Sequence, residues 1–182
     1  MWLERKRLSA FTIIFLSTVV LIIAVLSLIF ATLLKRRMPE IESARMIGEF
    51  APDFNLLTLN GQEVSLEQLR GKPILLNFWA TWCDPCKREM PLLEVISEKY
   101  DSLLIITINE GDKNAEVESF IKKESLSLLI LLDESLKIGE LYKINGYPTS
   151  VFIDEKGIIQ AVHLGELSSE LIEENLYLIG IK

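Results

Sequence analysis

The stretch FWATWCDPCKREMP, from Phe78 to Pro91, contains both cysteines of the 182-residue chain, Cys83 and Cys86. A nearly continuous apolar run, PILLNFWA at residues 73–80, overlaps its start and is typical of a buried central strand. Apolar residues spaced for one helix face follow over residues 85–100. The sequence therefore predicts a strand-to-helix junction that carries the first cysteine at the N-terminus of the helix.

The position of the two thiols favours redox chemistry. At a helix N-terminus, unpaired backbone amides and the helix dipole stabilise a thiolate, which is the nucleophile in disulfide exchange. Cys83 would be the exposed attacking thiol, and Cys86, one turn later, would resolve the mixed disulfide. A bridge across two intervening residues closes too small a loop to act as an effective structural staple.

Metal binding and an inert thiol pair are the alternatives to this redox interpretation. A closed structural zinc site needs four ligands, whereas the chain offers two cysteines and one histidine. Two thiolates are enough to bind Cu(I), so a copper site stays open. We expect a redox-active pair, Cys83 and Cys86, with no metal and no other cofactor.

An uncharged apolar segment at residues 8–34 predicts a membrane anchor. As a helix it would be about 40 Å long, which exceeds the roughly 30 Å hydrocarbon core of a bilayer. It is too long for the apolar region of a cleaved signal peptide, and no small-x-small cleavage motif follows it. A short basic tail at residues 1–7 precedes the segment, and a charged linker at residues 35–46 follows it.

Charge gives an orientation and excludes one class of partner. Three basic residues flank the segment on each side, so the positive-inside rule gives almost no preference between the two orientations. The positive charge of the free amino terminus slightly favours a cytoplasmic N-terminus. The rest of the chain would then lie on the extracytoplasmic side of the cell membrane. Residues 38–182 carry 13 basic and 25 acidic side chains, a balance that repels nucleic acid.

The remaining pattern predicts an α/β fold. An Asn60–Gly61 turn joins two short strands into an N-terminal β-hairpin. Apolar strands then alternate with helices, which implies parallel pairing, and a final strand pair adds antiparallel strands. The predicted strands after the first central one lie at residues 103–108, 128–132, 151–153 and 158–163. The expected architecture is a central mixed sheet flanked by helices, preceded by one transmembrane helix.

Several motifs together resemble a known family. WCDPC after the strand LLNFWAT, followed by GYPT at residues 146–149, is similar to the thioredoxin superfamily. EFAPDF, GQEVSL, LRGKP and CKREMP resemble the membrane-anchored ResA/TlpA-like thiol-disulfide oxidoreductases. The resemblance implies a thioredoxin-like domain over residues 47–182. It also implies that Cys83 and Cys86 are the active-site pair and that Pro148 is the cis-proline facing them.

The resemblance and the spacing together suggest further site residues. Tyr147 and Trp82 would join Pro148 in binding the substrate chain. Glu89 matches an acidic residue that the ResA-like group keeps near the dithiol. It lies three residues after Cys86 on the same helix face, so it could exchange protons with that thiol. The alternative is a solvated charge on the helix surface, like the neighbouring Lys87 and Arg88.

Three neighbouring residues are expected to tune the redox pair. Asn77 stands where thioredoxin usually has a buried aspartate, and asparagine cannot take a proton, so Glu89 is the natural substitute. The dipeptide between the cysteines is Asp84–Pro85. The negative charge of Asp84 should raise the pKa of the attacking thiol, which predicts a reductant with a potential nearer thioredoxin's roughly −270 mV than the roughly −120 mV of DsbA.

The resulting functional hypothesis is a membrane-tethered, extracytoplasmic reductase of protein disulfides. By resemblance, its substrate could be the haem-attachment cysteines of an apocytochrome c, with electrons from a membrane thiol-disulfide donor. A thiol peroxidase is one alternative, but Leu76 and Ala80 occupy the proline and threonine positions of the peroxiredoxin motif. A Cu(I) carrier is the other, although carriers of this fold resemble CxxxC with a partnering histidine.

Overall fold

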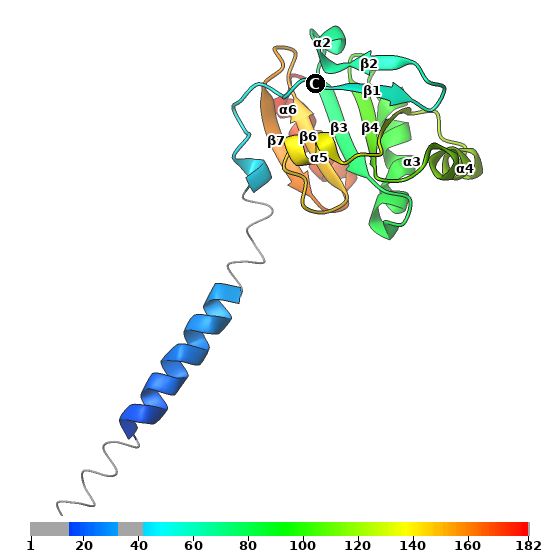
Figure 1. Ribbon diagram of the computed structural model, residues 1–182. Coiled ribbons are helices and arrows are strands. Elements are labelled where there is room, and N and C mark those ends of the chain that lie inside the picture. Colours follow the sequence, from blue (N-terminus) through cyan, green and yellow to red (C-terminus); the bar gives the residue numbers. More distant parts are fainter. Residues whose placement is uncertain (1–14, 33–41, 182) are drawn as a thin grey trace, which may run out of the picture. The chain divides into compact units, whose positions relative to one another are not determined.

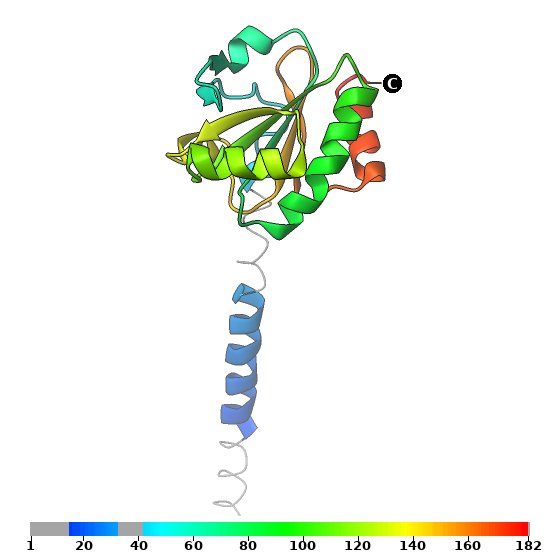
Figure 2. The same cartoon turned by 90° about the vertical axis from the view of Figure 1, so that its right-hand side faces the viewer.

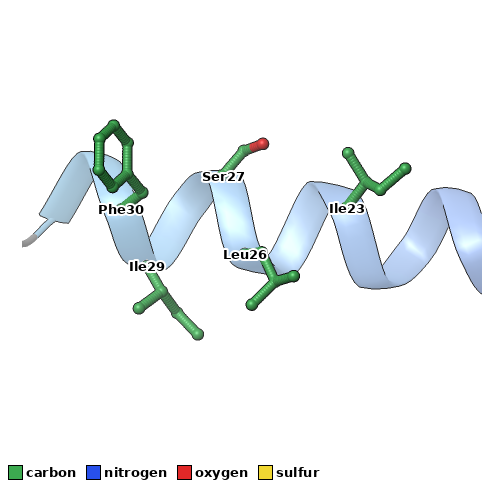
Figure 3. Close-up of a pocket in the computed structure, with 5 residues that line it drawn as sticks. All are labelled: Ile23, Leu26, Ser27, Ile29 and Phe30. Carbon is green, nitrogen blue, oxygen red and sulfur yellow. The ribbon is translucent and has the colours of Figure 1, made fainter.

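The computed structural model describes residues 15–32 and 42–181, which belong to two separate units (Figure 1). The first unit contributes one helix, Phe15–Thr32, which is long and apolar enough to cross a membrane. Figure 3 shows apolar side chains on opposite sides of its axis, Ile23 and Phe30 on one and Leu26 and Ile29 on the other. An apolar surface on both sides, without a polar stripe, fits a lipid environment. The ends of the predicted 8–34 segment and the tail at 1–7 lie outside the described residues.

The second unit is built on a seven-stranded mixed sheet in the order β2-β1-β5-β4-β3-β6-β7. The strands are β1 (Asn55–Thr58), β2 (Glu63–Ser65), β3 (Ile74–Trp79), β4 (Leu104–Glu110), β5 (Leu129–Asp133), β6 (Thr149–Ile153) and β7 (Ile159–Leu164). β4 pairs in parallel with β3 and with β5, whereas all other pairs are antiparallel. The mixed sheet, its parallel centre and both antiparallel strand pairs are therefore confirmed.

Helices cover both faces of the sheet. They are α2 (Leu66–Leu69), α3 (Asp84–Lys99), α4 (Asn114–Glu124), α5 (Lys137–Leu141) and α6 (Ser169–Leu178). α3, α4 and α6 share one apolar core with the sheet, and α2 and α5 share the other. Figure 1 shows α5 in front of the sheet, and Figure 2 shows α3 and α6 side by side on the same face. The two cores lie on opposite faces of the central strands.

The alternation of side chains along β3 explains where the site is built. Leu75 and Trp79 point into the core beneath α3, whereas Ile74, Leu76 and Phe78 belong to the opposite core. Asn77 lies between Leu75 and Trp79 in this period-two pattern. The strand thus places one buried polar side chain beneath α3.

Short local signals begin the helices and join the strands. Ser65 caps α2, its Oγ accepting a hydrogen bond from the Gln68 amide at 3.4 Å, and Ser168 caps α6 in the same way through Leu171. The turn between β1 and β2 contains Gly61 with φ of +80°, a conformation that glycine adopts readily. The Asn-Gly hairpin prediction is therefore confirmed.

The folded part of the second unit begins earlier than the sequence suggests. Ser43, which the predicted linker at residues 35–46 includes, donates from its Oγ to the Lys143 carbonyl oxygen at 2.7 Å. Met46 is buried in the core shared with α2 and α5. An apolar side chain within a charged stretch is a weak signal, but here it contributes to the core. The linker is therefore shorter than predicted at its C-terminal end.

Candidate active site

The two cysteines lie at the N-terminus of α3, at the strand-to-helix junction that the sequence predicts. They form a disulfide with an S–S distance of 2.07 Å and a Cα–Cα distance of 5.3 Å. Cys83 is the N-cap residue, and its Sγ accepts a hydrogen bond from the Cys86 amide at 3.2 Å. The first-turn amide that would stabilise a Cys83 thiolate therefore already points at its sulfur.

Access to the two sulfurs differs less than the sequence suggests. Cys83 is 5% exposed and Cys86 is fully buried. The order of exposure agrees with an attacking Cys83 and a resolving Cys86, but the disulfide form does not present Cys83 as an openly exposed residue. The surrounding core explains this, because both cysteines pack with Trp79, Ala80 and Met90.

Glu89 is a buried acid, not a solvated charge on the helix surface. Its side chain is 1% exposed on the face of α3 that packs on the sheet. Oε1 accepts a hydrogen bond from Asn77 Nδ2 at 2.7 Å, and Oε2 accepts one from the Leu167 amide at 3.0 Å. Asn77 Nδ2 also donates to Ser150 Oγ at 3.0 Å. The structure thus brings Asn77 and Glu89, which the sequence analysis links only by hypothesis, into direct contact.

The surroundings of Glu89 make it able to hold a proton near neutral pH. Burial raises the pKa of this carboxyl to about 7, although the hydrogen bonds from Leu167 and Asn77 act in the opposite direction. A group with a pKa near the working pH can both accept and donate a proton. Glu89, one turn beyond Cys86, is therefore a candidate proton acceptor for the resolving thiol.

Two residues of α3 hold the loop between β7 and α6 against the helix. Arg88 donates hydrogen bonds from Nε and Nη2 to the carboxylate of Glu166. The next residue, Glu89, accepts from the amide of Leu167. A bidentate arginine–carboxylate pair fixes orientation as well as distance. These contacts fix the loop on α3, and the Leu167 amide holds the carboxyl oxygen of Glu89 that Asn77 does not contact.

The residues expected to bind substrate gather beside the disulfide. The Tyr147–Pro148 peptide bond is cis, as the resemblance implies. Trp82, directly before Cys83, is 67% exposed, and its ring meets that of Tyr147 edge-on with centroids 5.6 Å apart. Pro148 accepts through its carbonyl from the Gly165 amide at 2.8 Å, which ties this segment to the end of β7. An exposed tryptophan packed on a half-buried tyrosine next to a redox-active disulfide is suited to receive a polypeptide chain.

Asp84 has less influence than its position in the sequence suggests. Its side chain is 80% exposed and pairs with Lys87 Nζ at 3.0 Å. Solvent and the lysine both weaken the effect of its charge on the neighbouring sulfur. Pro85 follows within the first turn of α3, where the missing amide hydrogen leaves no helical bond unmade. When it is ionised, the buried Glu89 acts on the pair through less solvent than Asp84 does.

Two acids of the site are absent from the sequence interpretation. Asp112 Oδ2 accepts from the Thr81 amide at 2.6 Å and from Asn109 Nδ2 at 2.9 Å, so it holds the loop that leads to Cys83. Glu110 is buried beneath Tyr147, whose hydroxyl donates to Oε2 at 3.3 Å. The predicted parallel order of the strands could have located these acids. Because β4 runs parallel to β3, the residues that follow β4 lie at the same end of the sheet as Thr81, which follows β3.

Comparison with known proteins identifies the family. The AhpC/TSA family profile matches residues 47–162. The thioredoxin-like protein YneN of Bacillus subtilis (strain 168) is 41% identical over 133 residues, covering 71% of this chain and 78% of that protein. The thiol-disulfide oxidoreductase ResA of Halalkalibacterium halodurans is 37% identical over 134 residues, covering 72% and 76%.

The fold agrees with these sequence relatives. The crystal structure of a candidate thiol:disulfide interchange protein DsbE from Chlorobium tepidum superposes with a TM-score of 0.69 at 28% identity. The match covers 74% of this chain and 98% of that chain. The chain therefore belongs to the AhpC/TSA family and is a thiol-disulfide oxidoreductase of thioredoxin-like fold.

Proposed function

We propose that this protein is a membrane-tethered reductase of protein disulfides that acts outside the cytoplasm. The observation that favours reduction over oxidation of substrates is the buried carboxyl of Glu89, which lies one helical turn after Cys86 on α3. When ionised, this acid disfavours a thiolate on the neighbouring sulfur, and a pair whose thiolate is disfavoured is more reducing. The name of ResA as a thiol-disulfide oxidoreductase supports this class of reaction.

The proposed reaction is a two-step thiol-disulfide exchange that starts from the reduced pair. The Cys83 thiolate attacks one sulfur of the substrate disulfide, forms a mixed disulfide and releases the other substrate sulfur as a thiolate. Cys86 gives its proton to Glu89, attacks Cys83 Sγ and releases the second substrate thiol. Two electrons pass from the protein to the substrate, and the protein is left with the Cys83–Cys86 disulfide. A thiol-disulfide donor in the membrane would reduce this disulfide again.

The substrate is proposed to be a polypeptide disulfide. The exposed Trp82 ring and the half-buried Tyr147 against which it packs offer a surface to a chain beside the disulfide, next to the buried Pro148. One candidate is the pair of haem-attachment cysteines of an apocytochrome c, which follows from the resemblance to ResA/TlpA-like proteins. Peroxide consumption with a thiol donor, or stoichiometric Cu(I) binding lost in Cys83→Ser, would instead favour the peroxidase or the copper carrier.

A redox titration tests the reductive direction. Equilibration with glutathione buffers should place the potential of the pair well below about −180 mV, nearer thioredoxin than DsbA. Because Asp84 is exposed and paired, Asp84→Asn should raise the potential by less than about 30 mV. Glu89→Gln should raise it more, since the buried charge acts through less solvent. A potential above about −180 mV for the wild-type protein would contradict the reductase assignment.

Thiol labelling in intact cells tests the tether and its orientation. After mild reduction, a membrane-impermeant maleimide should label the protein, and the protein should sediment with the membrane fraction. The variant Cys83→Ser/Cys86→Ser is the matched control, because no other cysteine exists in the chain. Labelling that appears only after lysis would place the domain in the cytoplasm. Recovery of a shortened protein in the medium would show that the apolar segment is cleaved.

A further inference from the structure

A buried acid on the opposite side of the sheet from Glu89 lies under the substrate-binding aromatic pair. Glu110, the last residue of β4, is 3% exposed, and its side chain lies on the face that carries Ile106 and Ile108. Its Oε2 accepts from the Tyr147 hydroxyl at 3.3 Å, which is a long hydrogen bond between oxygens. The ring of Tyr147 in turn meets Trp82 edge-on. Glu110 is therefore connected to the surface beside Cys83 through one side chain.

The surroundings of Glu110 are built closely around its carboxyl group. Gly139 of α5 packs so near that a Cβ atom there would collide with Oε2, and a larger residue at this position would displace the acid. Asp133, at the end of β5, accepts from the amides of Ile138 and Gly139 at 2.6 and 3.2 Å and so anchors α5 beside Glu110. Glu110 of β4 and Gly139 of α5 are therefore in close contact, and Asp133 of β5 fixes the start of α5 beside them.

The charge state that this site favours is the neutral acid. Burial raises the pKa of Glu110 to about 8, and the charge of Asp133 and a hydrogen bond to it act in the same direction. Oε1 is buried and accepts no hydrogen bond from the described residues, as fits an oxygen that carries the proton itself. A protonated Glu110 can donate to Asp133 while it accepts from Tyr147. The neutral Glu110 carboxyl then accepts from the Tyr147 hydroxyl without placing an unpaired negative charge in the core.

We propose that Glu110 is a positioning residue that fixes Tyr147, and through it the Trp82 ring, in the orientation that receives a polypeptide substrate. The inference rests on the proposed reduction of protein disulfides and adds a residue that acts on substrate binding alone. Glu110 touches neither sulfur and takes part in no proton transfer of the exchange. Its loss should weaken the binding of a polypeptide and leave the chemistry at Cys83 unchanged.

Comparing two disulfides separates positioning from a merely structural role. The full-length protein in detergent is assayed for insulin reduction, with KM and kcat determined separately. The reduced protein is also mixed with 5,5′-dithiobis(2-nitrobenzoate), a small disulfide without a peptide chain. Glu110→Val and Tyr147→Phe should each raise KM for insulin about fivefold, the effect of one hydrogen bond, and Glu110→Val should leave kcat and the small-disulfide rate unchanged. Glu110→Gln keeps an acceptor oxygen and should keep the wild-type KM.

The double variant completes the test. Glu110→Val/Tyr147→Phe should be no worse than either single variant, because both remove the same contact. Equal losses on insulin and on the small disulfide, or additive effects in the double variant, would overturn the inference. If Glu110→Val does not fold, Tyr147→Phe still decides, and an unchanged KM in that variant would overturn it. A wild-type protein that fails to reduce insulin would instead overturn the proposed function, on which the inference depends.

Discussion

Replacing Cys83 by serine should abolish disulfide exchange, with a loss on the order of 10³-fold or more, because a hydroxyl cannot form the mixed disulfide. Cys83 is the residue at the N-cap of α3, where the Cys86 amide already donates to its sulfur. The same amide would stabilise a thiolate in the reduced protein. The measurement is the rate at which the reduced protein reacts with a small disulfide, followed by release of the coloured thiol.

The matched control for this result is Cys86→Ser. That variant keeps the attacking thiol, so its first encounter with the small disulfide should proceed at close to the wild-type rate and then stop at the mixed disulfide. The two serine variants differ only in which sulfur remains, and each leaves one cysteine in the chain. A fast first reaction in Cys83→Ser together with a slow one in Cys86→Ser would exchange the roles assigned to the two cysteines.

Glu89→Gln should slow the resolving step about 10²-fold at neutral pH, the lower end of the usual contribution of a positioned acid–base group. The glutamine can still accept from Asn77 but cannot take the proton of Cys86. The inflection near pH 7 that the Glu89 carboxyl gives to the rate profile should disappear with it. Rapid mixing of the reduced protein with a peptide disulfide measures this step. Glu98→Gln, the same change at an exposed site on α3, should have no effect.

Glu89 should also make the stability of the oxidised protein depend on pH. Its pKa is raised by burial from 4.5 to about 7, so the folded state holds the proton more tightly than the unfolded state. The stabilisation is complete below about pH 4.5 and is lost as the pH rises to about 7. The change is about 3 kcal/mol, at 1.4 kcal/mol for each unit of pKa. Wild-type stability should therefore fall across this window relative to Glu89→Gln, as urea unfolding at a series of pH values would show. A constant difference between the two proteins would contradict a buried, titrating Glu89.

Much of the fold could be predicted because its signals are local. The apolar run at 73–80 predicts the central strand, and the Asn60–Gly61 turn predicts the hairpin. Each signal depends on residues close in the sequence and on a fixed structural period. The same argument placed Glu89 on the face of α3 shared with Cys86.

The parts that could not be predicted depend on contacts between distant residues. Glu110 is the last residue of β4 and Asp112 lies two residues after it. The predicted parallel order places both acids at the same end of the sheet as Thr81, but it does not show which groups they contact. The weak influence of Asp84 follows from its exposure and its pairing with Lys87. A sequence shows that a charge is adjacent to a thiol, but it does not show whether solvent or a tertiary neighbour surrounds that charge.

Trapping the substrate in cells tests the central claim most directly. In Cys86→Ser the mixed disulfide cannot be resolved, so partner proteins should accumulate on Cys83 as bands that appear without reductant and disappear with it. Mass spectrometry of these bands identifies the partner and the cysteine it uses. We expect extracytoplasmic partners bound to Cys83 in Cys86→Ser and none in Cys83→Ser. An absence of partners on Cys83, or equal trapping in both variants, would contradict it.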